Sequence, residues 1–195
     1  MQKINNILIG ADPELFLSKD NKVVSAVGII GGSKNQPKLI DNSGNAVQED
    51  NVMIEFNIKP SSTANEFIEN INFVKEYLTT YVKLKNNYTL DYSSSAVFDK
   101  KELKSKQAKQ FGCEPDFNVY EKDINIPPKA SNTLRTCGGH IHVGYDNPSQ
   151  EISEKIVYAM DITLGLDSII LDVDGHTRRK MYGRAGSFRF KDYGI

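Results

Sequence analysis

The sequence predicts an α+β fold, because segments in which apolar side chains alternate with a period of two are interspersed with segments of helical spacing. The clearest strand is 52–58, where apolar and polar residues alternate. The clearest helix begins after Thr63, which precedes a glutamate by three residues in the capping-box pattern, and it ends near Asn87. The 195 residues, 39% of them hydrophobic, suit one well-packed domain over 1–195.

Charge and cysteine content exclude several classes of protein. Lysine and arginine number 24 against 25 acidic residues, and this balance disfavours a general affinity for nucleic acids or anionic membranes. Cys113 and Cys137 are too few for a disulfide scaffold and form no Cys-x-x-Cys pair. No apolar run is long enough to span a bilayer and no signal peptide opens the chain, so we expect a soluble cytoplasmic protein without a membrane partner.

Proline and turn residues divide the start of the chain into short strands. Residues 4–9 and 14–17 are predicted strands separated by a kink at Pro13. Because a proline nitrogen cannot join a ladder, this segment is expected at an edge or a bulge. Residues 19–22 predict a hairpin turn into a strand over 23–27.

Further elements follow the first helix. Residues 88–98 predict an interrupted strand, and 99–110 predict a lysine-rich helix with a solvated basic face. A turn at 112–116 and a long loop at 121–133, which carries two prolines, come next. Residues 149–171 predict a helix that is apolar enough to be mostly buried.

The stretch CGGHIHVG at 137–144 is the strongest candidate for a functional site. As a short strand it places His140 and His142 on one face, with Ile141 and Val143 on the other. The flanking glycines leave room for a backbone or a ligand to come close. The alternative is a pair of histidines whose hydrogen bonds are satisfied by neighbouring polar groups.

Acidic residues and one loop lysine are further candidates. Asp12 and Glu14 lie two residues apart, so their carboxylates share one side and repel unless a positive group lies between them; two unrelated acids in a solvated turn are the alternative. Glu55 lies within an apolar strand, where a carboxylate is costly unless it is solvated, paired or bound to a metal. The glycine loop 28–37 lacks the spacing of a P-loop and is expected to deliver Lys34 to a bound anion.

A dense basic run with interleaved aromatic residues and glycines covers 177–191. The planar fork of arginine suits phosphate and carboxylate groups, and glycines let such groups approach the backbone. A solvated charged surface is the alternative interpretation of this run.

Four motifs occur in one order along nearly the whole chain: GADPE at 10–14, QEDNVMIEFN at 48–57, CGGHIHVG at 137–144 and YGRAGSFR at 182–189. Together they resemble the phage-type carboxylate-amine ligases, which are relatives of glutamine synthetase and glutamate-cysteine ligase. The resemblance implies a curved, mainly antiparallel sheet with helices packed on its outer face, arranged around ATP and divalent metal ions.

The resemblance also implies roles for individual residues. The ligands of Mg²⁺ or Mn²⁺ would be Asp12, Glu14, Glu55, His140 and His142. The groups that hold ATP or stabilise phosphoryl transfer would be Lys34, His140, Arg184 and Arg189. In this chemistry a substrate carboxylate attacks the γ-phosphate to form an acyl phosphate, which an amine then captures. The implied partners are small-molecule or peptide carboxylates and amines. The resemblance leaves open whether the protein forms a homo-oligomer.

The end of the sequence departs from the family pattern. The family usually has an acid and an arginine soon after a Tyr-Gly pair, whereas this sequence stops at 193–195. The last catalytic strand is therefore expected to be missing. The protein is expected to be either a truncated or inactive member of the family or an active member with other ligands. Two other functions stay open. One is a His-x-His transition-metal hydrolase or oxygenase, and the other is a non-catalytic remnant that binds a nucleotide or a host protein.

Overall fold

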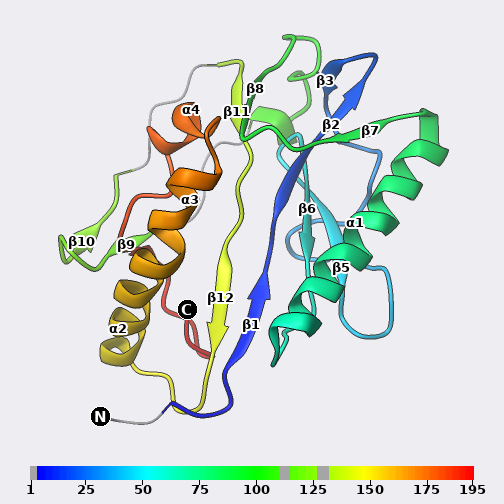
Figure 1. Cartoon of the computed structure of the whole chain (residues 1–195). Coiled ribbons are helices and arrows are strands. Elements are labelled where there is room, and N and C mark those ends of the chain that lie inside the picture. The colour runs from blue at the N-terminus through cyan, green and yellow to red at the C-terminus, as the bar shows by residue number, and fades with distance from the viewer. Residues whose placement is uncertain (1–3, 110–114, 127–131) are drawn as a thin grey trace. The chain divides into compact units, whose positions relative to one another are not determined.

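The computed structural model describes residues 4–109, 115–126 and 132–195, and there it has a mixed α+β fold with mainly antiparallel sheets and few helices (Figure 1). The chain divides into two compact units. We call Ile9–Phe111 with Ser131–Ile141 the sheet unit, and Met1–Leu8, Gly112–Ala130 and His142–Ile195 the helical unit. Most of the predicted turn at 112–116 and the two prolines of the predicted loop lie outside the described residues.

The sheet unit is built on a six-stranded antiparallel sheet in which strands β3-β2-β6-β5-β4 follow one another and β7 also pairs with β2. These strands are β2 (Glu14–Lys19), β3 (Lys22–Val24), β4 (Lys38–Leu39), β5 (Ala46–Asp50), β6 (Met53–Asn57) and β7 (Thr89–Asp91). A separate antiparallel pair joins β8 (Ser95–Val97) to β11 (Leu134–Thr136). The strand β1 (Leu8–Ala11) precedes β2 and crosses the boundary between the units.

One face of this sheet is covered by the long helix α1 (Ala64–Asn86), which runs beside β5 and β6 in Figure 1. The buried side chains between them are Leu15, Leu17, Val47, Ile54, Phe56, Val74, Leu78 and Val82. Full burial of one such side chain stabilises a fold by about 1.5–3 kcal/mol. The opposite face carries Phe16 and Met53 in a second apolar cluster, beside the acidic residues described below.

The predicted boundaries of α1 are confirmed. Thr63 caps the helix, because its Oγ1 accepts a hydrogen bond from the backbone N–H of Glu66 at 3.2 Å. Asn87 ends the helix in the left-handed conformation, with φ 54°.

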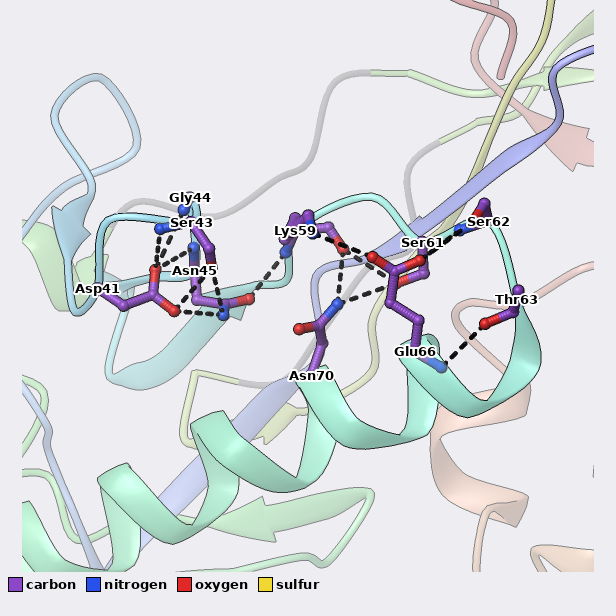
Figure 2. Close-up of polar contacts among 10 residues, drawn as sticks. All are labelled: Asp41, Ser43, Gly44, Asn45, Lys59, Ser61, Ser62, Thr63, Glu66 and Asn70. Atoms are coloured by element: carbon purple, nitrogen blue, oxygen red, sulfur yellow. Dashed lines mark hydrogen bonds and ion pairs between the residues drawn. The ribbon is translucent and has the colours of Figure 1, made fainter.

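A polar network ties the first turn of α1 to the β4–β5 hairpin (Figure 2). The Glu66 carboxylate accepts from the ammonium of Lys59 at 3.0 Å, and the Lys59 backbone N–H donates to Asn45 Oδ1 at 2.8 Å. Asn45 Nδ2 in turn donates to Asp41 Oδ2 at 2.6 Å. Asn45 is only 2% exposed, so this side chain links two loops from within the fold.

The structure confirms one prediction for the start of the chain and corrects another. Asp20 and Asn21 have φ of 50° and 59°, as a two-residue hairpin turn with both central residues left-handed requires. Of the two alternatives predicted for this segment, an edge strand or a bulge, the edge strand is wrong, since β2 pairs with β3, β6 and β7. Pro13 lies between β1 and β2, so its missing N–H removes no hydrogen bond from either strand, while its carbonyl accepts from Phe56 at 3.1 Å.

The predicted lysine-rich helix is wrong over its described residues. Residues 99–109 form turns and one short 3-10 helix, Gln107–Lys109. Only Leu103 and Ala108 are buried there, and a single pair five residues apart supplies no continuous helical stripe. Packing of these two side chains therefore decides the path of the backbone.

The helical unit contains the last long helical run, which starts after its predicted cap Ser149. It comprises α2 (Gln150–Met160), the π-helical turn η2 (Asp161–Gly165) and α3 (Leu166–Leu171). The prediction that it is mostly buried is wrong, since Ile170 and Leu171 are 73% and 82% exposed. No helix among the described residues is long and apolar enough to cross a membrane.

The other elements of the helical unit are short. The strands β9 (Phe117–Asn118), β10 (Asp123–Ile124) and β13 (Ser187–Phe188) form an antiparallel sheet in the order β10-β9-β13. The short helix α4 (His176–Arg179) precedes β13, and the histidine strand is β12 (Ile141–Gly144). The segment expected to be a loop at 121–133 therefore contains the strand β10.

Candidate metal centre

Three carboxylates gather on the face of the sheet opposite α1. Glu14 on β2 lies directly across from Glu55 on β6, and Asp50 lies on the neighbouring strand β5. One oxygen from each of these side chains lies within 4.8 Å of the other two. All three side chains are partly buried, so their mutual repulsion is less screened than it would be in bulk water.

The surroundings favour protonation of two of these acids. Burial raises the pKa of Glu14 from 4.5 to about 7; the N–H of Gly138 opposes this shift, and the charges of Asp50 and Glu55 add to it. Burial is also the main cause that raises the pKa of Glu55, and a hydrogen bond from Gln48 opposes it. Two protonated carboxylic acids can coexist at this spacing, whereas ionised ones need a compensating cation.

The glycine segment before the histidine strand completes this side of the sheet unit. The backbone N–H of Glu14 donates to the carbonyl of Gly138 at 2.9 Å, and the backbone N–H of Gly138 donates to Glu14 Oε2 at 2.8 Å. The N–H of His140 donates to Asp12 Oδ1 at 2.6 Å, and Nδ1 of the same imidazole lies 3.0 Å from that oxygen. Asp12 and His140, which are 128 residues apart in sequence, are thus neighbours beside Glu14.

Gly139 makes this close approach possible. Its φ is +154°, and a Cβ at this position would lie 2.9 Å from the Cα of Pro13. A side chain here would push the histidine segment away from Asp12, so the position requires glycine.

Gln48 supplies an unsatisfied oxygen next to the carboxylates. It pairs directly with Glu55 across β5 and β6, and the residue is only 3% exposed. Its Oε1 accepts no hydrogen bond from the described residues. A buried acceptor without a partner costs about 1–3 kcal/mol, a penalty that a bound cation would remove. Carboxylate and amide oxygens together are the ligands that hard divalent cations prefer, so these residues fit such an ion.

Sequence reasoning did not single out Asp50 and Gln48 as ligands. Both belong to a hairpin whose turn contains Asn51, with φ 54°. The register of this hairpin brings Gln48 and Asp50 to the face that Glu55 occupies. Asn51 between two alternating segments is the signal that could have found them.

Lys34 lies at the exposed tip of a tight turn in the sheet unit, between Ser33 and Gln36, whose backbones exchange hydrogen bonds of 3.0 and 2.9 Å. The preceding glycine loop is anchored by Glu49, whose carboxylate accepts three backbone N–H groups, from Gly28, Ile30 and Gly31.

The other three predicted site residues belong to the helical unit, and each has its own partner there. His142 Nδ1 lies 2.8 Å from the hydroxyl of Tyr193. Arg189 forms an ion pair with Asp116 at 2.8 Å, and Arg184 forms one with Glu121. The sheet unit therefore brings together Asp12, Glu14, Glu55 and His140, and the contacts described for His142, Arg184 and Arg189 are with residues of the helical unit.

Comparison of the chain with family models, with curated proteins and with solved structures found no match. The candidate site therefore rests on its own geometry and chemistry.

Proposed function

We propose that the sheet unit binds Mg²⁺ or Mn²⁺ through Glu14, Asp50 and Glu55. The observation that carries this proposal is the clustering of their three carboxylate oxygens within 4.8 Å. The unpartnered oxygen of Gln48 beside them supports it, because it adds a neutral oxygen ligand at a buried position. A divalent cation would offset both the repulsion among the acids and the loss of hydration of that amide.

We further propose that this centre serves an ATP-dependent carboxylate-amine ligase with a glutamine-synthetase-like sheet. This step rests on the order of the four sequence motifs, two of which supply Asp12, Glu14, Asp50 and Glu55. The bound cation would supply charge neutralisation for ATP phosphates. Lys34 would hold phosphate oxygens, and the Asp12 carboxylate would orient the imidazole of His140.

The composition of the centre favours this proposal over a His-x-His transition-metal enzyme. The clustered ligand atoms are oxygens, and imidazole-rich sites are those that favour zinc or iron. His140 and His142 also have different partners, Asp12 and Tyr193 respectively, so neither contact pairs the two rings.

A metal titration tests the centre directly. Isothermal titration calorimetry of the full chain with Mn²⁺ is expected to show binding that Glu55→Gln weakens at least tenfold, because a ligand charge is lost. Glu69→Gln is the matched control, since this exposed carboxylate lies on α1. Equal Mn²⁺ affinity in the two variants would contradict the metal centre. Release of ADP with a panel of carboxylate and amine substrates then tests the ligase step, and absence of turnover despite Mn²⁺ binding would refute that step alone.

A further inference from the structure

A concentrated positive surface lies in the sheet unit, in a segment that the metal centre does not use. The lysine segment, residues 99–109, carries five exposed lysines: Lys100, Lys101, Lys104, Lys106 and Lys109. Its two acids are Asp99 and Glu102, and the Lys101 ammonium lies 4.0 Å from Glu102. Within the described residues no acid forms an ion pair with the other four lysines. The whole chain has a formal charge of −1, so this positive charge is local.

The lysine segment is fixed to the fold, which distinguishes it from a solvated basic tail. Leu103 and Ala108 are buried in the apolar cluster that includes Phe16 and Met53. The Glu102 carboxylate accepts a hydrogen bond from the backbone N–H of Ser25 at 3.0 Å. These anchors fix the backbone that carries the five exposed lysines.

The same segment is hydrogen-bonded to the residues on both sides of Asp50. Gln107 Nε2 donates to the carbonyl of Glu49 at 3.3 Å, and Asn51 Nδ2 donates to the carbonyl of Ala108 at 3.4 Å. Arg135 Nη2 also donates to the carbonyl of Ala108, at 2.8 Å. The backbone of the lysine segment therefore lies next to the hairpin that carries Asp50 of the candidate metal centre.

We propose that the lysine segment binds an acidic peptide and holds it beside the metal centre. Lysine ammonium groups act as point charges on flexible stems, so a row of them suits a chain of carboxylates better than one compact group. Nucleic acid fits less well, because the segment contains neither the aromatic side chains that stack on bases nor any arginine. The inference rests on the proposed function in one respect: the bound peptide would be the carboxylate substrate of the ligase.

The test measures peptide binding without metal or ATP. Fluorescence anisotropy of a labelled hexaglutamate peptide is followed with the full chain in EDTA, at low and at physiological salt. The triple variant Lys104→Gln, Lys106→Gln, Lys109→Gln is expected to weaken binding about 5- to 50-fold, since each exposed ion pair contributes modestly. Binding by the unchanged chain should also weaken as salt rises. The control triple variant, Lys75→Gln, Lys83→Gln, Lys85→Gln on α1, has the same net charge and should bind nearly as the unchanged chain does.

The outcomes separate this inference from the proposed function. Selective loss of hexaglutamate binding in the first triple variant supports the inference, whatever the Mn²⁺ titration gives. Equal loss in both triple variants would assign binding to net charge and overturn it. Tighter binding of a labelled hexathymidine than of hexaglutamate would overturn it in favour of nucleic acid. Failure of Mn²⁺ binding with intact peptide binding would refute the metal centre and the placement of the peptide beside it, and would leave the peptide site itself standing.

Discussion

Replacing Glu14 by glutamine should change how the stability of the protein depends on pH. Burial and the neighbouring acids raise the folded-state pKa of Glu14 to about 7 from its ordinary 4.5. Between these two values the folded state binds more protons than the unfolded state, so stability falls as pH rises. The contribution of Glu14 is therefore fully present below about pH 4.5 and is lost as pH rises through about 7.

The magnitude follows from the shift. A change from 4.5 to about 7 corresponds to about 3 kcal/mol between the two protonation states, and this is an upper bound for the gain from Glu14→Gln at pH 8. Glutamine keeps an oxygen that can accept from the N–H of Gly138, so the backbone contact survives the substitution. Glu55, whose pKa is also raised by burial, stays in place, and a smaller pH dependence of the same sign should persist.

Urea unfolding in EDTA at several pH values between 5 and 8 provides the assay. We expect the free energy of unfolding of Glu14→Gln to differ least from that of the unchanged protein at pH 5 and to exceed it most at pH 8. Excess Mn²⁺ at pH 8 should stabilise the unchanged protein more than the variant, because a bound ligand adds to folded-state stability. Identical pH dependence in the two proteins, or a less stable variant at pH 8, would refute the assigned environment of Glu14.

Two further substitutions test the geometry around the site and the loops. Gly139→Ala should destabilise the protein by about 1–2 kcal/mol more than Gly28→Ala, and it should weaken Mn²⁺ binding. Both glycines have positive φ, but only the new Cβ at 139 meets backbone atoms. Equal unfolding free energies for the two variants would contradict this prediction. Asn45→Ala should lower the free energy of unfolding in urea by about 2–3 kcal/mol, since it removes the buried partner of the Lys59 N–H and of Asp41. Substitution of the exposed Ser43 by alanine should lower it by less than about 1 kcal/mol. A smaller loss for Asn45→Ala than for Ser43→Ala would refute this account of the network in Figure 2.

Features encoded by neighbouring residues were predicted correctly from the sequence. The N-cap Thr63 and the hairpin turn at Asp20 and Asn21 depend on side chains and backbone angles within a few residues. The lysine segment was mispredicted because its path depends on Leu103 and Ala108 packing against residues from other strands. Propensity alone gives no access to such long-range contacts.

The candidate site was predictable in part. Alternation along two strands put Glu14 and Glu55 on polar faces, and the family resemblance suggested that they meet Asp12 and His140. Asp50 was overlooked because its position depends on which residues pair across the β5–β6 hairpin. A shift of that register by one residue would move Asp50 to the face covered by α1.

The assembly of the sheet unit from two distant segments sets an order of events during synthesis. Asp12, Glu14, Asp50 and Glu55 all leave the ribosome well before Gly138 and His140, and the intervening residues include a segment of the other unit. At about 5–20 residues per second, the gap between Glu55 and His140 lasts on the order of ten seconds. During this time the nascent sheet lacks the N–H donors that Gly138 and His140 provide, and Phe16 lacks the cover of Cys137. The second apolar cluster and the hydrogen bonds to Asp12 and Glu14 therefore stay incomplete during this interval.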